Sequence, residues 1–393
     1  MSDAQPDLVE RDEPSLPSPA RSFAHLLRTE TPWVTYALLA ALGLGFVLET
    51  AFAVRPSGGL LEADVMTLIS TGGLMQSLVR DGEWYRLFTC AFLHADLFHL
   101  ALNGLVLFLA GRLLENLLGR AWVVAIFVVS ALGGSALSLA LNAPEVVSVG
   151  ASGAIMGMLA AAFVCLFRFP SDDRAQVQLQ LFQILIPSLI PLVSHRIGGK
   201  VDYAAHIGGA IVGVLVGLVL LWTWRRSEPR PRLRAAARAV AVCGVALFVI
   251  GAVLVAKNHA TYADAAAAAA NEELLIPNAA LPRTEADMVS QADSLVNRFP
   301  RDPRTRLFHA LRLVKDGDAA GAQVELRRGL DETEILRVNF PNRELEIAMR
   351  AFLAELLLGE NKPQEAEHVA APVCKAGEGG AVPGPLRELA VCK

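Results

Sequence analysis

Charged side chains are scarce in this chain: Asp, Glu, Lys and Arg make up 19% of its 393 residues, whereas 53% are hydrophobic. Its mean hydropathy is +0.43. A soluble domain of this length needs more charged surface, and here the apolar residues come in long blocks. The composition therefore excludes an ordinary soluble protein and indicates an integral membrane protein.

The apolar residues form seven windows that are long enough to cross a bilayer, for which about 20 residues are needed. They cover roughly residues 33–54, 87–109, 121–141, 151–167, 179–193, 203–224 and 236–256. Gln and Pro residues interrupt the fifth window, which makes it the weakest of the seven. The first thirty residues lack the apolar run and cleavage site of a signal peptide, and their acidic, Pro-rich composition predicts a disordered tail.

Basic residues are missing from one set of connecting loops. Residues 142–150 contain no Lys or Arg, whereas the connection after the sixth window carries six arginines: Arg225, Arg226, Arg230, Arg232, Arg234 and Arg238. Because basic loops stay in the cytoplasm, this distribution predicts a cytoplasmic N-terminus and an extracytoplasmic C-terminal region. The Arg- and Ala-rich composition fits a bacterial inner membrane, where we place this multi-pass protein.

Cysteine is also rare, with five residues. Cys90, Cys165 and Cys243 fall within or at the ends of the predicted spans and read as small buried residues. Cys374 and Cys392 lie on the predicted extracytoplasmic side, where either a disulfide between them or two separate thiols fits the sequence.

The sequence divides into four segments: a tail over 1–30, a membrane domain over 31–257, a linker over 258–283 and an extracytoplasmic helical domain over 284–393. Within the last segment, "ALRLVKDGDAAGAQVELRRGL" and "AELLLGENKPQEAEHVAAPVC" share an apolar helix, a Gly-acidic turn and an Ala-rich helix. This pattern is similar to tetratricopeptide (TPR-like) hairpins, and a generic helical domain remains the alternative. Its expected role is to bind a peptide or protein partner, or to cap the membrane domain.

Several polar side chains fall at membrane depth, where each is costly and is a functional candidate. The second window contributes His94, His99 and Asn103, and the last two share one helical face because they are four residues apart. The fourth window contributes Ser152, and the sixth contributes His206. A shared, water-filled cavity that opens outward would satisfy all of them.

The chemistry of these groups assigns their roles. A serine hydroxyl needs an adjacent base to become a nucleophile, and neutral histidine is the usual base, which would pair Ser152 with His206. Asn103, His99 and the Ser152 amide would donate hydrogen bonds to an oxyanion. The alternative for Ser152 alone is a helix-packing residue.

Glycines at four-residue spacing accompany the serine and the histidine. Gly153 and Gly157 follow Ser152, and Gly209 and Gly213 follow His206, with the members of each pair four residues apart; Gly150 and Gly153 leave space around the serine hydroxyl. Facing stripes of small residues let two helices approach closely. The pattern therefore predicts that the fourth and sixth windows pack together and bring the hydroxyl near the imidazole.

Three motifs in this order resemble the rhomboid family of intramembrane serine proteases. In chain order they are His99-Leu-Ala-Leu-Asn103 preceded by His94, then Gly150-Ala151-Ser152-Gly153, and Ala205-His206 followed by Gly209 and Gly213. The resemblance covers roughly residues 30–225. It extends to "EWYRLFT", which supplies Arg86, and to "GRLLE", which supplies Glu115 as a structural hydrogen-bonding residue.

The resemblance implies an all-α polytopic fold with a six-helix core, to which this chain adds a seventh span and the C-terminal domain. It implies a Ser152–His206 dyad that cleaves single-span or polytopic membrane proteins in the lipid bilayer, with the fifth span as a lateral gate and no cofactor, metal or nucleic acid. Met156 stands where many members of the family have an aromatic residue against the base. Asp202 reads as a loop or cap residue.

Two other classes of function compete with the protease. One is a catalytically silent rhomboid-like protein that binds membrane proteins, although this chain retains both the serine and the histidine. The other is a transporter, for which the expected intramembrane acidic residues and inverted repeats are missing.

Overall fold

The computed structural model describes residues 31–190 except 57, 58 and 60, then 201–225, 228, 230–377 and 380–392. The predicted tail over 1–30 lies outside these residues. Within the described ranges the regular elements are all helical, and an isolated antiparallel bridge joins Leu74 to Ser148. The chain divides into two compact units, Met1–Ala260 and Thr261–Lys393.

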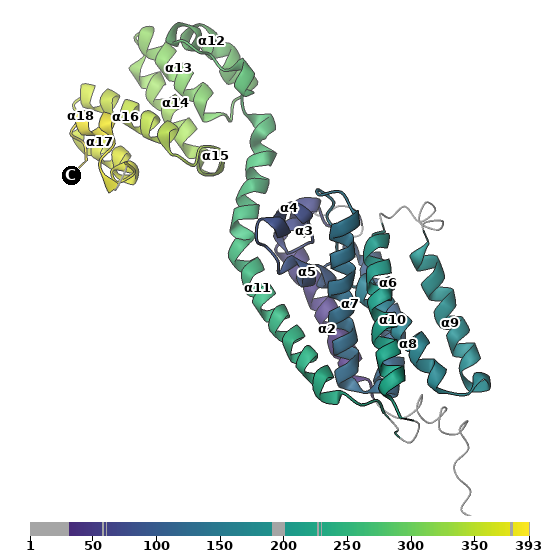
Figure 1. Ribbon diagram of the computed structural model, residues 1–393. Helices are drawn as coiled ribbons and strands as arrows, with labels where there is room; N and C mark the ends of the chain where they lie inside the picture. The colour runs from purple at the N-terminus through teal and green to yellow at the C-terminus, as the bar shows by residue number, and fades with distance from the viewer. Residues whose placement is uncertain are drawn as a thin grey trace, which may run out of the picture. The chain divides into compact units, whose positions relative to one another are not determined.

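The first unit is a bundle of apolar helices (Figure 1). Its long helices are α2 (Trp33–Ala51), α6 (Leu97–Leu118), α7 (Arg120–Leu141), α8 (Ser152–Cys165), α9 (Ser171–Leu189), α10 (Tyr203–Thr223) and α11 (Arg234–Asn271). In the described part of the chain, α2, α6, α7, α10 and the stretch Arg234–Leu274 are long and apolar enough to cross a membrane, and α8 is a shorter apolar helix. These helices identify an integral membrane protein.

The second predicted span is displaced in the structure. The window over 87–109 was wrong at both ends, because α6 runs from Leu97 to Leu118. Asp96 has extended backbone, and its side chain accepts the His99 N–H, which caps the helix there. The preceding residues form the short helices α5 (Arg86–Thr89) and η1 (Cys90–Phe92) instead. His94 therefore precedes the helix.

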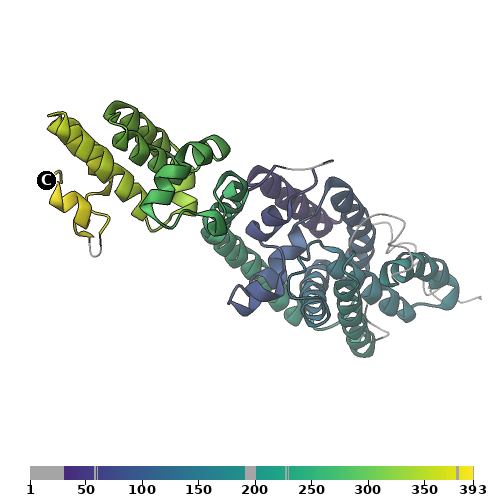
Figure 2. The ribbon, with the colours of Figure 1, turned by 90° about the horizontal axis from the view of Figure 1, so that it is seen from above.

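The fifth predicted span also begins earlier than expected. Helix α9 starts at Ser171, which follows Pro170, and it continues through Pro187 to Leu189. Residues 191–193 of the predicted window lie outside the described residues. Helix α9 stands at the edge of the bundle in both views (Figures 1 and 2).

Helix α8 lies at the centre of this unit and is buried along almost its whole length. It packs most extensively against α10, and also against α7, α6 and α9. Its residues are mainly Gly, Ala and Met, so neighbouring helices approach it closely on every side. The beginning of α8, where Ser152 lies, is consequently surrounded by other elements.

Two further small helices, α3 (Val65–Ser70) and α4 (Gln76–Arg80), lie between α2 and α5. The buried side chain of Arg86 holds this segment together. Its guanidinium donates to the carbonyls of Ile69 at 2.6 Å and Gly73 at 2.9 Å, and it pairs with Glu83 at 2.6 Å. The adjacent bridge between Leu74 and Ser148 joins the segment to the loop before α8.

The second unit contains α12 (Glu285–Arg298), α13 (Pro303–Lys315), α14 (Ala319–Asp331), α15 (Thr333–Asn339), α16 (Glu344–Gly359), α17 (Pro363–Ala370) and α18 (Gly384–Glu388). Helices α13 and α14 pack as one pair and α16 and α17 as another. These pairs occupy the two similar sequence stretches. The Sγ atoms of Cys374 and Cys392 are bonded.

Helix α11 extends into the segment expected to be a linker. It continues to Asn271, so the first half of residues 258–283 is helical. The run of alanines near its end has the highest intrinsic helix propensity, which explains why the helix does not stop at the end of the apolar window.

Candidate active site

Ser152 is the first residue of α8, and its side chain is half-buried. The N–H groups in the first turn of a helix have no partner within the helix, and the helix dipole makes this end electropositive. A hydroxyl at this position therefore lies beside backbone donors that can stabilise negative charge.

Gly150 shapes the chain just before Ser152. Its φ of +120° favours glycine, and a Cβ placed there would lie 2.8 Å from Cε1 and 2.9 Å from Nε2 of His99. The same Cβ would lie 3.6 Å from Nδ2 of Asn103. The two side chains of α6 thus converge on the backbone two residues before the hydroxyl.

The Asn103 amide has an unused donor. The residue is only 7% exposed, and its Nδ2 has no hydrogen-bond partner among the described residues. Buried polar groups are almost always hydrogen-bonded, so an exception calls for an explanation. A bound group that carries negative charge would supply one.

His206 lies on α10 and is 8% exposed. Its Nδ1 lies 2.7 Å from the backbone oxygen of Ser188 near the end of α9. A carbonyl oxygen only accepts, so Nδ1 carries the proton, and Nε2 of the neutral ring is left with a lone pair. The ring of Tyr203, one turn earlier, meets the imidazole edge-on with centroids 6.2 Å apart.

Glycines bring α8 and α10 together. A Cβ on Gly153 would lie 3.0 Å from the oxygen of Ala205, which is the residue before His206. On Gly209 a Cβ would overlap the carbonyl of Gly153, and on Gly213 it would overlap that of Gly157. The residue after the serine therefore contacts the residue before the histidine, which places the two side chains on facing helices.

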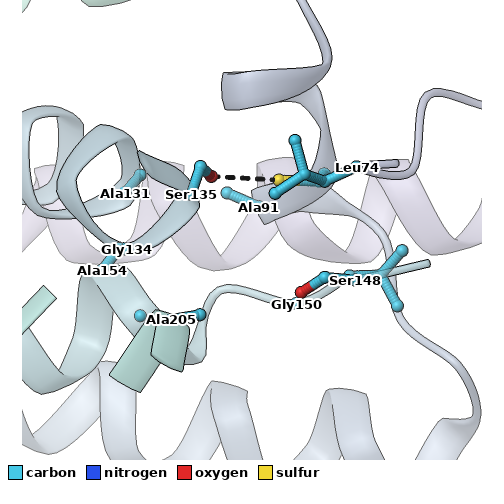
Figure 3. A pocket seen from close by; sticks show the side chains of 12 residues that line it. Leu74, Ala91, Ala131, Gly134, Ser135, Ser148, Gly150, Ala154 and Ala205 are labelled. Carbon is cyan, nitrogen blue, oxygen red and sulfur yellow. Dashed lines mark hydrogen bonds between the residues drawn. The ribbon is translucent and has the colours of Figure 1, made fainter. Parts of the chain in front are cut away.

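A small cavity lies beside this contact (Figure 3). Its wall includes Ser135, Ser148, Gly150, Ala154 and Ala205, which come from α7, the loop before α8, α8 itself and α10. In Figure 3 the hydroxyl of Ser135 is joined to the thiol of Cys90, at 3.5 Å. Apart from Leu74 and Val149, the lining residues are Gly, Ala, Ser and Cys.

Two sequence-predicted residues support the helices around the site. Glu115 is buried, and its carboxylate accepts the N–H groups of Val34 and Thr35 and the hydroxyl of Thr35 at 2.9–3.1 Å. It therefore caps the first turn of α2 from α6. Arg86 organises the segment before α5, as described above.

His94 and Met156 are placed less directly. The ring of His94 is fully buried, and its centroid lies 5.1 Å from that of the His99 ring. Neither of its ring nitrogens has a hydrogen-bond partner within the described part of the chain. Its backbone N–H donates to Glu49 at 3.0 Å. Met156 is buried in α8.

Sequence reasoning missed three contributors to the site. Ser188 contributes a backbone oxygen, Tyr203 contributes a ring contact, and Glu49, on a distant helix, accepts a hydrogen bond. None of these contacts belongs to a side-chain motif that could be recognised in the sequence. The described residues contain no group of three or more His, Cys, Asp or Glu side chains that could hold a metal ion.

The fold and the site define a helical membrane protein with a serine and a histidine on two tightly packed helices. Residues 81–223 match the family model of the Rhomboid domain, which confirms the resemblance of this segment to the rhomboid family.

Among its relatives, RHOMBOID-like protein 5 of Arabidopsis thaliana is 36% identical over 165 residues, which cover 41% of this chain and 52% of that protein. Rhomboid protease AarA of Providencia stuartii is 31% identical over 183 residues, 41% of this chain and 64% of AarA. Rhomboid protease GluP of Bacillus subtilis (strain 168) is 30% identical over 200 residues, 51% of this chain and 37% of GluP. The chain thus spans about half the length of the curated relatives it matches.

Proposed function

We propose that the protein is a serine endopeptidase that cleaves transmembrane-anchored proteins with a Ser152–His206 dyad. The observation that carries the proposal is the contact between Gly153 and Ala205, which puts the two side chains on facing, closely packed helix ends. The serine alone could be a packing residue, but a packing serine does not need an imidazole on the facing helix.

In this mechanism His206 acts first as a base. The Ser188 carbonyl holds the proton on Nδ1, so Nε2 accepts the proton of the Ser152 hydroxyl as its oxygen attacks the peptide carbonyl. His206 then donates that proton to the leaving amine. The Ser188 carbonyl also stabilises the imidazolium that forms in between, because it accepts from Nδ1 in both states.

The oxyanion would be bound at the beginning of α8. The Ser152 N–H, the Asn103 amide and the His99 ring supply donors there, and the Asn103 donor needs no rearrangement because it has no partner among the described residues. A donor fixed in advance in a site that excludes bulk water stabilises the transition state by roughly 3–4 kcal/mol.

The remaining parts of the proposal concern substrates and topology. Rhomboid-family proteases act on membrane proteins within the bilayer, and we propose single-span or polytopic membrane proteins as substrates here. They would enter past α9, which stands at the bundle edge (Figure 2). The N-terminus would be cytoplasmic, α11 would be a seventh span, and the second unit would be an extracytoplasmic, TPR-like partner-binding domain.

The test is cleavage of a labelled single-span substrate by the purified full-length protein in detergent. Ser152→Ala and His206→Ala should each lose activity by at least about 10⁴-fold, because nucleophile and base act as a unit. A fluorophosphonate probe should label the wild-type protein at Ser152. Equal cleavage by the wild type and both variants would eliminate the dyad, and failure of the wild type to cleave or to react with the probe would favour a silent binding protein.

A further inference from the structure

Asp202 joins three segments of the membrane unit through one carboxylate. It precedes α10 directly, and its Oδ1 accepts the N–H of Ala205 at 2.9 Å, which caps that helix. Its Oδ2 accepts two hydroxyl donors at 2.6 Å each: Ser138, on α7, and Ser148, in the loop before α8. Asn142 donates in turn to Ser138 at 3.0 Å.

Ser148 and Asp202, which one of these bonds joins, both lie close to the proposed dyad along the chain. Ser148 precedes Ser152 by four residues, and Asp202 precedes His206 by four residues and accepts the His206 N–H with its backbone oxygen at 3.1 Å. The carboxylate therefore links the loop that precedes the nucleophile to the helix that carries the base.

The loop before α8 has few other anchors. The backbone of Ser148 pairs with Leu74 in both directions at 2.9 and 3.0 Å, and the N–H of Gly150 donates to Cys90 at 2.9 Å. These bonds hold the loop to the segment before α6, on the side of the oxyanion donors. The hydroxyl of Ser148 makes the bond that ties it to α10.

The carboxylate is also held in its charged form. Burial by itself would raise the pKa of Asp202, but the hydrogen bonds from Ser138, Ser148 and Ala205 outweigh it, and the pKa lies below the usual value. Hydrogen bonds to an ionised acceptor are shorter and stronger than neutral ones, which fits the two distances of 2.6 Å.

We infer that Asp202 is a positioning residue, which sets the separation of Ser152 and His206 by bonding Ser148 while it caps α10. The inference rests on the proposed function. Asp202 does not contact the substrate, so its loss should lower kcat and leave KM nearly unchanged, because a small misplacement of the reacting groups costs much of the rate.

The experiment measures kcat and KM for the wild type and five variants, each well below its unfolding temperature. Ser148→Ala should lower kcat by about tenfold or more with KM changed by less than about twofold. Ser138→Ala removes an equivalent bond to the same oxygen but leaves the loop attached, so its loss should be smaller. The double variant Asp202→Ala/Ser148→Ala should be no slower than Asp202→Ala alone, because both changes break one link. Asp64→Ala removes a cap aspartate from α3 and should match the wild type.

Hydrogen exchange tests this inference separately from the proposed function, because amide exchange rates can be measured whether or not the protein cleaves a substrate. Amides of residues 149–153 should exchange faster in Ser148→Ala and Asp202→Ala than in the wild type and Asp64→Ala. Unchanged exchange, or an additive loss of kcat in the double variant, would overturn the positioning role. An inactive wild type with faster exchange in both variants would remove the protease and leave the link in place.

Discussion

At the scale of single residues, the proposed site depends on a buried hydrogen-bond donor that has no acceptor among the described residues. The amide of Asn103 is buried and donates to nothing in the described part of the chain, while Gly150 keeps the backbone close to it. Such a donor costs stability in the resting protein and is useful only when negative charge develops beside it.

This reasoning predicts opposite effects on rate and stability for Asn103→Ala. The cleavage rate should fall by about 10²-fold or more, because one oxyanion donor is lost. The unfolding temperature should stay the same or rise, because a buried donor without a partner is removed. Kinetics and thermal unfolding of the same preparation test both. A large loss of stability would show that the amide has a structural role instead.

At the scale of elements, the close approach of α8 and α10 determines whether the site exists. Their glycines lie at matching positions, so the carbonyl of Gly153 occupies the space that a side chain on Gly209 would need. Helices that approach this closely gain packing and exclude lipid between them.

Gly209→Ala should therefore reduce both activity and stability. The added methyl group would force the helices apart, and overpacking of this kind costs about 1–3 kcal/mol. We expect cleavage to fall by at least about 100-fold, because misplacing the two reacting groups by about 1 Å has that effect. Gly43→Ala, on α2, is the matched control, since a Cβ there meets nothing within 4 Å. Equal behaviour of the two variants would contradict the packing argument.

At the scale of the whole molecule, two units of different chemistry share one chain. The membrane unit is held by small residues and a few buried polar bonds, whereas the second unit uses ion pairs around its helices. Glu325 is an example. Burial would raise its pKa, but the guanidinium of Arg306, at 2.6 Å, and further partners hold it below its ordinary value of 4.5.

This pKa direction predicts acid sensitivity of the second unit. A depressed pKa in the folded state means that Glu325 contributes stability above about pH 4.5, and that the contribution is lost as the pH falls through the lower, folded value. Hydrogen exchange of α13 and α14 should therefore accelerate below this pH. Glu325→Gln should exchange faster than the wild type at pH 7 and depend less on pH. An identical pH dependence in the two proteins would refute the assignment.

Much of the membrane unit could be predicted from residue patterns, because each pattern is local. Apolar windows locate the helices, and glycines four residues apart predict which helix faces approach. The patterns failed where a local cap outweighed hydropathy: Asp96 starts α6 at Leu97, although apolar residues begin ten positions earlier. The alanine run, by contrast, is a helix-favouring pattern, and α11 continues through it to Asn271.

By itself, the sequence determined the membrane class of the chain, the resemblance of one segment to the rhomboid family and the approximate positions of most apolar helices, because composition, spacing and motif order are written along the chain. Only the tertiary structure decided which groups from distant segments share a bond. The Ser188 oxygen on His206 and the Asp202 carboxylate on Ser148 join residues that are 18 and 54 positions apart. Such bonds depend on where two distant segments meet in three dimensions, and a single bond of this kind leaves no periodic signal in the sequence.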